Sequence, residues 1–202
     1  MGRHGAVVTG VDFSPRSIGL ARALAEESGI PATFICSDVL NLRENLRAEF
    51  DIVFSSYGIL HWLSDLKPWA DAIAHFLKPG GFFYIVEDHP FMRVFDSDPT
   101  LAELKVSNTY FFSGAYACEI EGSYATDFKG EKRTYYMWDH SIGEVVTTLI
   151  EAGLRLEFLH EFPFALRAKF PMMTKGADGY WYLGREDKMV PLLFSLKASK
   201  PR

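Results

Sequence analysis

The chain has 202 residues, 48% of them hydrophobic and 23% charged, a mixture that excludes a disordered or low-complexity protein. Its formal net charge is −5 and its Lys and Arg residues form no cluster, so we expect no binding to nucleic acid. Cys36 and Cys118 lie far apart, and no apolar run is long enough for a membrane helix. Together with an N-terminus unlike a secretion signal, these features predict a single cytoplasmic domain over residues 1–202, with no membrane partner.

Strands and helices are predicted to alternate over the first 88 residues. Short apolar runs bounded by turn residues predict strands, and the first run is β-branched, which is typical of a strand buried on both faces. Ser14-Pro15 supplies an N-cap and a first-turn proline for one helix. Apolar residues at helical spacing from Leu66 to Leu77 predict a second helix. The predicted strands cover residues 6–11, 32–36, 50–55 and 82–87.

The alternation breaks after residue 88, where prolines and aromatic residues follow one another without a clear period. Residues 115–124 and 132–138 predict two antiparallel strands around a turn at Lys129-Gly130. We interpret about 89–139 as an insertion, because this stretch is too short to hold a core of its own.

The regular pattern resumes after the insertion. Residues 142–150 carry an apolar stripe at helical spacing, and Gly153 ends the predicted helix. Residues 154–161 and 190–198 predict two final strands. Strands that alternate with helices indicate a parallel, doubly wound α/β sheet, whose strands have their carboxyl ends along one edge.

Polar side chains follow each predicted strand at the edge where doubly wound folds bind their ligands. Asp12 ends the first strand, where a carboxylate can accept hydrogen bonds from the vicinal hydroxyls of a ribose. Asp38 follows the second, where its carboxylate or the neighbouring amides can meet an adenine amine. The third and fourth end at Ser55-Ser56-Tyr57 and Glu87-Asp88-His89. Each Asp can equally cap the next helix, and we predict no metal site, because adjacent strand residues point to opposite faces.

Four motifs occur in order along the chain: Val-Asp-Phe-Ser-Pro, Cys-Ser-Asp-Val, Phe-Asp-Ile-Val-Phe-Ser-Ser-Tyr-Gly and Leu-Lys-Pro-Gly-Gly. Over residues 6–87 this order resembles the class I S-adenosylmethionine-dependent methyltransferases, and among them the small-molecule-type methyltransferase domain proteins. The resemblance implies a Rossmann-like, mostly parallel sheet with an antiparallel C-terminal strand and a β-hairpin insertion. It also implies S-adenosyl-L-methionine as the cofactor and a small molecule as the methyl acceptor.

The same resemblance assigns roles to residues at the strand ends. It implies that Asp12 holds the cofactor ribose and that Phe13 packs on the adenine. Asp38, with Val39, would border the adenine, and Ser55 to Tyr57 would line the methionine end. The residues predicted to bind the cofactor are therefore Asp12, Phe13, Asp38, Val39, Ser55 and Tyr57.

The sequence departs from the family pattern at its N-terminus. The family's first motif, a strand followed by a glycine-rich loop and a helix, is missing, and Gly2, Gly5 and Gly10 do not replace it because no strand precedes them. In the family this strand lies between the strands that correspond to residues 6–11 and 51–55. We therefore expect an N-terminally truncated form with two strand edges that lack hydrogen-bond partners, which would impair its activity.

Methyl transfer is an in-line displacement, so the enzyme mainly aligns donor and acceptor, and a general base helps when the acceptor is a hydroxyl. His61, His89 and His140 can each supply that base, with Glu87 as a partner. We favour His89, which follows a strand end, and His140, which follows the aromatic insertion, as the catalytic residues. The aromatic side chains of the insertion would cover an apolar acceptor, or else only pack the insertion onto the sheet.

Two alternatives to an active methyltransferase fit parts of the sequence. A non-catalytic Rossmann-like binding module, or pseudoenzyme, would keep Asp12 and Asp38 without the glycine-rich loop. A nicotinamide-dependent oxidoreductase would also need that loop, and it would not explain the Leu-Lys-Pro-Gly-Gly turn. We expect a monomer or a homodimer.

Overall fold

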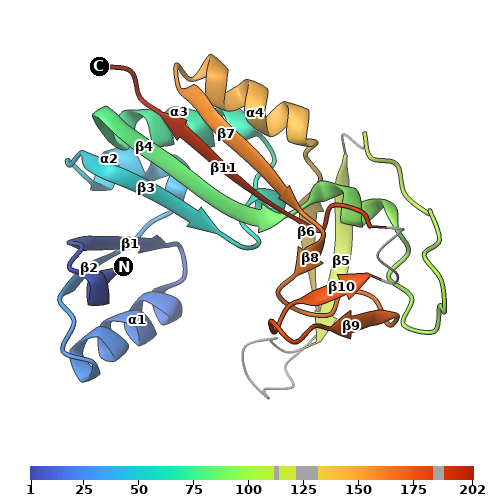
Figure 1. Ribbon diagram of the computed structural model, residues 1–202. Helices are drawn as coiled ribbons and strands as arrows, with labels where there is room; N and C mark the ends of the chain where they lie inside the picture. The colour runs from blue at the N-terminus through green and yellow to red at the C-terminus, as the bar shows by residue number, and fades with distance from the viewer. Residues whose placement is uncertain (112–113, 122–131, 184–188) are drawn as a thin grey trace.

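The computed structural model describes residues 1–111, 114–121, 132–183 and 189–202 (Figure 1). Its first part, which we call the N-terminal unit, consists of β1 (Val8–Asp12), α1 (Pro15–Glu27) and β2 (Ala32–Cys36). The two strands are parallel, with Val8 opposite Ala32 and Asp12 opposite Cys36. As predicted, Ser14 caps α1, because its hydroxyl oxygen accepts a hydrogen bond from the Ser17 N–H at 3.2 Å.

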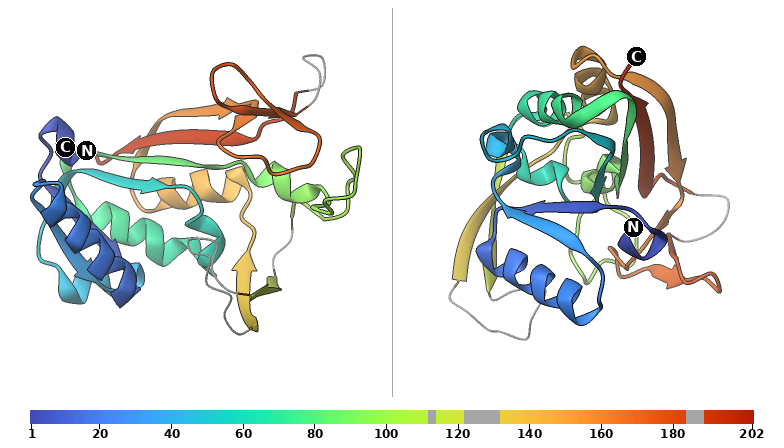
Figure 2. Two further views of the ribbon diagram at one scale, coloured as in Figure 1. Left: turned by 90° about the horizontal axis from the view of Figure 1, so that it is seen from below. Right: turned by 90° about the vertical axis from the view of Figure 1, so that its left-hand side faces the viewer.

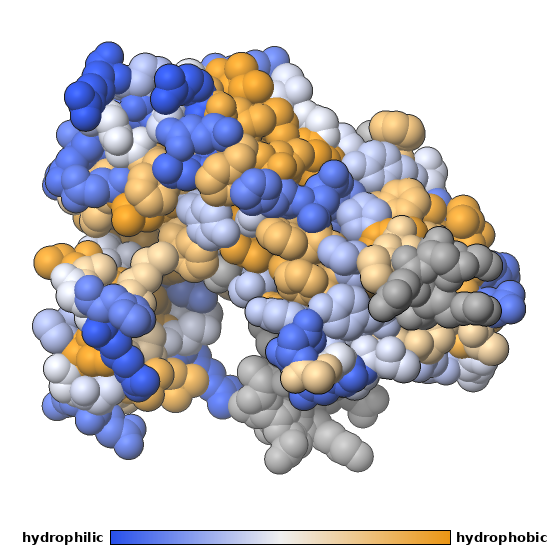
Figure 3. Space-filling view, in the orientation of Figure 1, coloured by the Kyte–Doolittle hydropathy of each residue, from blue (hydrophilic) through white to orange (hydrophobic). Residues whose placement is uncertain are grey.

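The prediction that the first strand is buried on both faces is wrong. Val8 to Gly10 are only partly buried, Val11 and Asp12 are exposed, and Ile18 is the one buried residue of α1. Among the described residues, β1 pairs with β2 alone, so its second edge carries no strand. The space-filling view shows an open gap between much of the N-terminal unit and the rest of the molecule (Figure 3). Burial on both faces requires neighbours that these residues do not have.

A second sheet forms the centre of the protein, with strand order β3-β4-β11-β7. β3 and β4 are parallel, and β11 is antiparallel to both of its neighbours, β4 and β7. The predicted α/β fold, with parallel strands and an antiparallel C-terminal strand, is confirmed. β3 is a terminal strand of this sheet among the described residues. The strands are β3 (Phe50–Ser56), β4 (Leu77–Asp88), β7 (Arg155–Phe162) and β11 (Leu193–Ser199).

Two amphipathic helices, α3 (Leu66–Phe76) and α4 (Ile142–Glu151), pack on one face of this sheet (Figures 1 and 2). Trp69 of α3 is 1% exposed and meets Phe83 of β4 edge-on, with ring centroids 5.5 Å apart. Alternate residues of β4 and β11 point to the same face, so the main apolar core lies between the sheet and the two helices. The sheet residues of this core include Phe83, Ile85, Phe194 and Leu196.

β4 begins earlier than predicted, because the turn at residues 78–81 lies inside the strand as an irregularity in its pairing with β3. Gly80 has a φ of 82°, which favours glycine. The Gly80 N–H donates to the Lys200 carbonyl, and the Lys200 N–H donates to the Gly81 carbonyl, both at 2.9 Å. These bonds hold the turn against the C-terminal residues, so residues 78–81 remain part of β4.

The predicted hairpin is present as β5 (Ala115–Glu121) and β6 (Lys132–Trp138), which pair antiparallel. Its expected turn at Lys129-Gly130 lies outside the described residues. A small sheet that the sequence did not predict is formed by β8 (Phe164–Ala165), β10 (Trp181–Leu183) and β9 (Met173–Lys175), and it holds a second apolar cluster with Met92 and Leu192.

The remaining elements are short helices: η1 (Gly2–His4), η2 (Val39–Asn41), α2 (Leu42–Asn45), η3 (Leu60–Trp62) and η4 (Pro90–Val94). In the part of the chain that the structure describes, no helix combines the length and the apolar character needed to cross a membrane.

Candidate functional site

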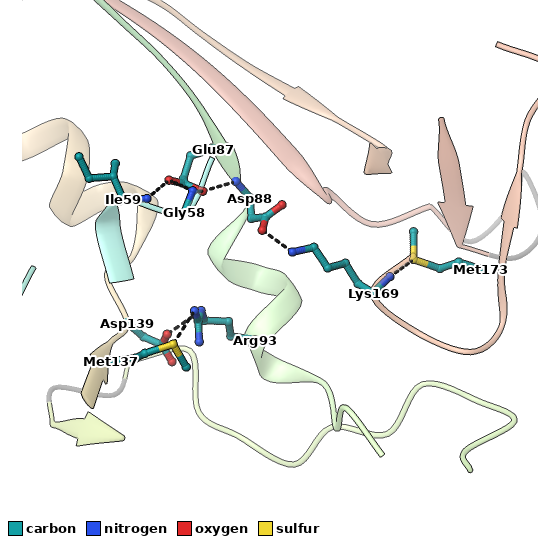
Figure 4. A network of polar contacts seen from close by, with 9 residues as sticks. All are labelled: Gly58, Ile59, Glu87, Asp88, Arg93, Met137, Asp139, Lys169 and Met173. Atoms are coloured by element: carbon teal, nitrogen blue, oxygen red, sulfur yellow. Dashed lines mark hydrogen bonds and ion pairs between the residues drawn. The ribbon is translucent and has the colours of Figure 1, made fainter. Parts of the chain in front are cut away.

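The carboxyl ends of β3 and β4 are joined by the Glu87 carboxylate, which is 4% exposed. It accepts hydrogen bonds from the Gly58 N–H at 2.6 and 2.7 Å and from the Ile59 N–H at 2.9 Å (Figure 4). Tyr57, just before them, has a φ of 40°, which is uncommon for a residue other than glycine. Its N–H donates to the Val86 carbonyl at 2.9 Å. Hydrogen bonds to a carboxylate are short and strong, so the bonds that Glu87 accepts fix the loop 57–59 on the end of β4.

A pocket of about 390 Å³ lies beside this loop, and we call it the central pocket. Two ion pairs are part of its wall. Lys169 Nζ lies 2.5 Å from Asp88 Oδ2, and Arg93 Nε lies 2.9 Å from Asp139 Oδ1. Figure 4 shows Asp88, at the end of β4, and Arg93, in η4, reaching toward these partners. The apolar part of the wall includes Met92, Phe95, Met137 and Phe170.

His89 and His140 both line the central pocket, and in both rings each nitrogen lies within hydrogen-bond distance of a protein partner. His89 is 5% exposed, with Nε2 2.8 Å from Glu161 Oε1, and its Nδ1 accepts the Phe91 N–H at 3.1 Å. Burial lowers the pKa of His89, and the bond to Glu161 opposes that shift. His140 has Nδ1 3.0 Å from Glu144 Oε1 and Nε2 2.7 Å from the Leu63 carbonyl oxygen. Both ring nitrogens of each imidazole therefore face a protein partner in this arrangement.

His61, on η3, is the third imidazole of the pocket wall. Its ring lies 5.0 Å from the ring of Trp62, and it packs so closely on Gly58 that a Cβ there would sit 3.2 Å from His61 Cε1. Burial, with a smaller contribution from the Arg93 guanidinium, lowers the pKa of His61 to about 4. No hydrogen bond to its ring nitrogens is found among the described residues. At neutral pH this imidazole is uncharged and keeps a lone pair.

The residues predicted to hold the adenosine part of the cofactor come together where β1 and β2 end. The Ser37 N–H donates to the Asp12 carbonyl at 3.0 Å, which joins the two strand ends. Asp38 begins η2, and its Oδ1 accepts the Leu40 N–H at 2.9 Å. Val39 is the first residue of that helix, and Phe13 follows Asp12 directly. Asp38 therefore does cap a helix, which was the alternative to a binding role.

Ser55 and Tyr57 lie apart from that group, at the end of β3 in the second sheet. Ser55 pairs with Ile85 of β4 within the ladder. Burial raises the pKa of the Tyr57 hydroxyl, and nearby Tyr180 adds to the effect, so this hydroxyl stays protonated. The predicted cofactor residues thus form two groups, one at the ends of β1 and β2 and one at the end of β3.

The first group fits the adenosine part of S-adenosylmethionine. Asp12 Oδ1 accepts the Ser14 N–H at 2.7 Å, and within the described residues Oδ2 makes no hydrogen bond, so it can accept one from a ribose hydroxyl. The Phe13 ring is 77% exposed, which leaves a face for adenine to stack on. For the methionine part, the described residues contain no glycine-rich loop that follows a strand, and Ser55 and Tyr57 are the candidates.

Sequence reasoning missed Lys169, Arg93 and Asp139 as residues of the pocket. Lys169 and Asp88 are 81 positions apart in the chain, and Lys169 lies in a stretch without regular spacing. Arg93 and Asp139 stand at either end of the predicted insertion. The sequence of the insertion shows charged residues among many aromatic ones, but this pattern does not indicate which charged residues pair with each other.

Comparisons with known proteins agree with this fold. Residues 1–81 match a family model described as a methyltransferase domain. The ubiquinone biosynthesis O-methyltransferase of Idiomarina loihiensis is 38% identical over 81 residues, which are 40% of this chain and 33% of that protein. That of Xylella fastidiosa strain 9a5c is 34% identical over 85 residues, 42% of this chain and 34% of that protein. The match thus spans about a third of the length of these relatives.

Solved structures match over almost the whole chain. A putative S-adenosylmethionine-dependent methyltransferase from Listeria monocytogenes has a TM-score of 0.62 at 18% identity, and covers 99% of this chain and 83% of its own. An S-adenosylmethionine-dependent methyltransferase from Mesorhizobium loti has a TM-score of 0.62 at 20% identity, and the match covers 98% of this chain and 82% of that chain. At these identities the likeness establishes the fold.

Proposed function

Because the chain has the fold of the class I S-adenosylmethionine-dependent methyltransferases, and its first 81 residues match a methyltransferase domain, we propose that it transfers a methyl group from S-adenosyl-L-methionine to a small molecule. The observation that carries this proposal is the central pocket. It opens at the carboxyl ends of β3 and β4, beside the loop that Glu87 fixes, and ligands of open α/β sheets bind at such strand ends.

The comparisons support a methyltransferase over a non-catalytic binding module, since the relatives and solved structures named above are methyltransferases. Two of them are named as O-methyltransferases of ubiquinone biosynthesis, which favours an oxygen atom of a small organic acceptor. We further propose that the protein acts in the cytoplasm, as a monomer or homodimer, and without nucleic acid. The net charge of −5 supports the last point.

When bound, S-adenosylmethionine supplies an activated methyl group. In our proposal, Asp12 holds its ribose, Phe13 stacks on its adenine, and Asp38 and Val39 border that ring. Ser55 and Tyr57, at the end of β3, would line the methionine end, near the place where the acceptor would meet the methyl group. The rate then depends mainly on alignment of the two reactants.

An acceptor hydroxyl must also lose its proton to a base. His89 and His140 remain our predicted bases, since both stand in the pocket wall. Each would first have to release one of its two hydrogen bonds, to Glu161 or Phe91 for His89 and to Glu144 or Leu63 for His140.

Calorimetric titration of the 202-residue chain with S-adenosylmethionine tests the proposal most directly. We expect measurable binding, and at least about tenfold weaker binding by Asp12→Ala, because a hydrogen bond to a charged group contributes about 1.5–3 kcal/mol. Asp51→Ala is the matched control, since Asp51 is an exposed acid at the start of a strand instead of its end. No binding by the original chain, or equal binding by the Asp12 variant, would refute the assignment.

A further inference from the structure

The four-stranded sheet has a second face, opposite to α3 and α4, on which no helix packs among the described residues (Figure 2). Strand residues alternate between the two faces, so Val53, Phe83 and Ile85 point toward the helices and their neighbours in each strand point away. We call this second side the outer face. Its apolar and aromatic side chains include Ile52 and Phe54 of β3, Phe82 and Tyr84 of β4, and Phe158 and His160 of β7.

The rings of the outer face contact one another across the strands. Phe54 stacks on Tyr84, with ring centroids 6.1 Å apart and ring planes 13° apart. Tyr84 meets Phe158 at 6.3 Å, although β11 lies between their strands. Phe158 in turn stacks on His160, with centroids 4.4 Å apart. These contacts form a continuous band of rings that crosses the sheet from β3 to β7.

The charges in and beside this band are already compensated. Lys197 of β11 has its Nζ 2.8 Å from Glu157 Oε2 and 4.6 Å from the centroid of the Phe82 ring. At the start of β3, Asp51 pairs with Lys78 at 3.0 Å. A charged partner would have to displace these pairs, whereas the band can face a copy of itself without bringing uncompensated like charges together.

The band is exposed to an extent that suggests an interaction surface. Ile52 is 48% exposed and Phe54 is 42% exposed, and contiguous apolar surface of this kind marks sites of association. Four strands about 4.8 Å apart and about seven residues long give a face of roughly 15 by 20 Å. The ring contacts continue beyond it to Phe162 and Phe164, whose centroids are 5.2 Å apart. This extent fits an interface at the small end of the range for specific dimers, about 600 Å² per partner.

We propose that the outer face is the interface of a homodimer, in which two copies of this chain pack these faces against each other about a two-fold axis. Such an axis requires a surface that is complementary to itself, and a neutral band of rings meets that requirement. Sheets pack face to face about 10 Å apart, with the side chains of the two faces between them. Of the two oligomeric states proposed above, the inference selects the homodimer, and it does not rest on methyl transfer.

Sedimentation velocity of the full chain at increasing protein concentration tests the proposal. We expect a reversible equilibrium between monomer and dimer, with a dissociation constant in the micromolar range because the face is small. Nuclear magnetic resonance locates the interface. The ring signals of His160, assigned by their loss in His160→Gln, should shift with concentration, and those of the exposed His4 should not. A monomer at every concentration, or His160 signals that stay in place, would overturn the proposal.

Variants of Phe54 test the band directly. Phe54→Lys places a charge between the two copies, and we expect at least about tenfold weaker dimerisation, because a buried charge without a partner is costly. Phe54→Leu keeps an apolar side chain and should still dimerise. Leu20→Lys changes an exposed leucine of α1 in the same way, outside the outer face, and is the matched control. If circular dichroism shows that Phe54→Lys does not fold, Ile52→Lys takes its place. Equal dimerisation of the folded lysine variant and the original chain would refute the assigned interface.

The result is separable from that of the proposed function, because calorimetry measures binding of S-adenosylmethionine in the same samples. A monomer that binds the cofactor refutes the homodimer and leaves the methyltransferase proposal in place. A dimer that His160 and Phe54 report, but that does not bind the cofactor, supports the interface and refutes methyl transfer by this chain.

Discussion

The N-terminal unit and the four-stranded sheet each contain a parallel strand pair with a helix alongside, but they bury their apolar side chains to very different degrees. In the sheet region, Trp69 is 1% exposed and Phe194 is fully buried, whereas Leu20 and Leu24 of α1 are both 65% exposed. Both regions also have a strand edge without a partner among the described residues, on β1 and on β3. Only the sheet region has two helices packed on one face.

This difference divides the candidate site. Asp12, Phe13, Asp38 and Val39 belong to the loosely packed region and the segment that follows it, while the central pocket belongs to the tightly packed one. Regions with few buried contacts open at low free-energy cost, so we expect the part that would hold adenosine to be much more dynamic than the pocket. Binding of a cofactor would then have to order the N-terminal unit as well as contact it.

The largest expected effect comes from the core of the sheet region. Trp69→Ala removes the ring that packs on Phe83 and should lower the free energy of unfolding by about 3–5 kcal/mol. Urea unfolding followed by circular dichroism measures this, since the variant also loses a tryptophan. A loss below about 1 kcal/mol would mean that this face does not hold the main core, and the contrast between the regions would fail.

Next in size is the effect of Glu87→Gln. The amide would keep one acceptor oxygen and turn donors toward the N–H groups of Gly58 and Ile59, so we expect a loss of about 2–3 kcal/mol in the free energy of unfolding. Glu26→Gln, on the exposed face of α1, makes the same chemical change in the other region and should stay within about 0.5 kcal/mol. Similar values for the two variants in the same denaturation assay would contradict the assigned role of Glu87.

A third effect depends on pH. The pKa of His61 in the folded protein is about 4, below the ordinary 6.5, so the unfolded chain binds the proton first as pH falls. The stability that neutral His61 contributes to the free energy of unfolding is complete above pH 6.5. It is lost as pH falls from 6.5 to 4, and the loss is about 1–2 kcal/mol once the partial exposure of the ring is allowed for. His89 acts in the same direction, because burial lowers its pKa also.

Denaturation at several pH values should therefore show a shallower dependence for His61→Phe than for the original chain. His4→Phe is the control, since His4 is exposed and precedes the N-terminal unit. An unchanged slope in the His61 variant would show that its imidazole is not buried as described.

The smallest effect is expected on α1. Leu24→Gln changes an apolar residue that is 65% exposed, and such surface substitutions usually stay within about 0.5 kcal/mol. Unfolding in urea again provides the measurement. A loss of 2 kcal/mol or more would show that Leu24 is covered in solution, and the two regions would then be more alike than the structure indicates.

Local sequence signals predicted most of the fold. The strand at residues 32–36 was found with its observed ends, because an apolar run there is bounded by Pro31 and Ser37. The degree of burial of residues 6–11 was predicted wrongly, since burial depends on what lies across from a strand and not on its own composition. β8, β9 and β10 were missed, because strands of two or three residues are shorter than any periodic pattern.

The site was predictable only in part for the same reason. Acids at strand ends were located correctly from the position of each strand. The partner of Glu87 was not, because its carboxylate binds the amides of Gly58 and Ile59 and not the expected histidine. The pairing of Lys169 with Asp88 joins distant segments, and only the folded chain brings them together. The roles of His89 and His140 stay predictions.

The bond from Glu87 to the loop 57–59 has a consequence for protein engineering. Both partners belong to β3, β4 and their ends, so the shape of the central pocket is set without help from the N-terminal unit. A chimera that takes its first 36 residues from a homologue with firmer cofactor binding should then keep the acceptor preference of this protein. The boundary after Cys36 would in that sense be the natural joint at which two such proteins can be recombined.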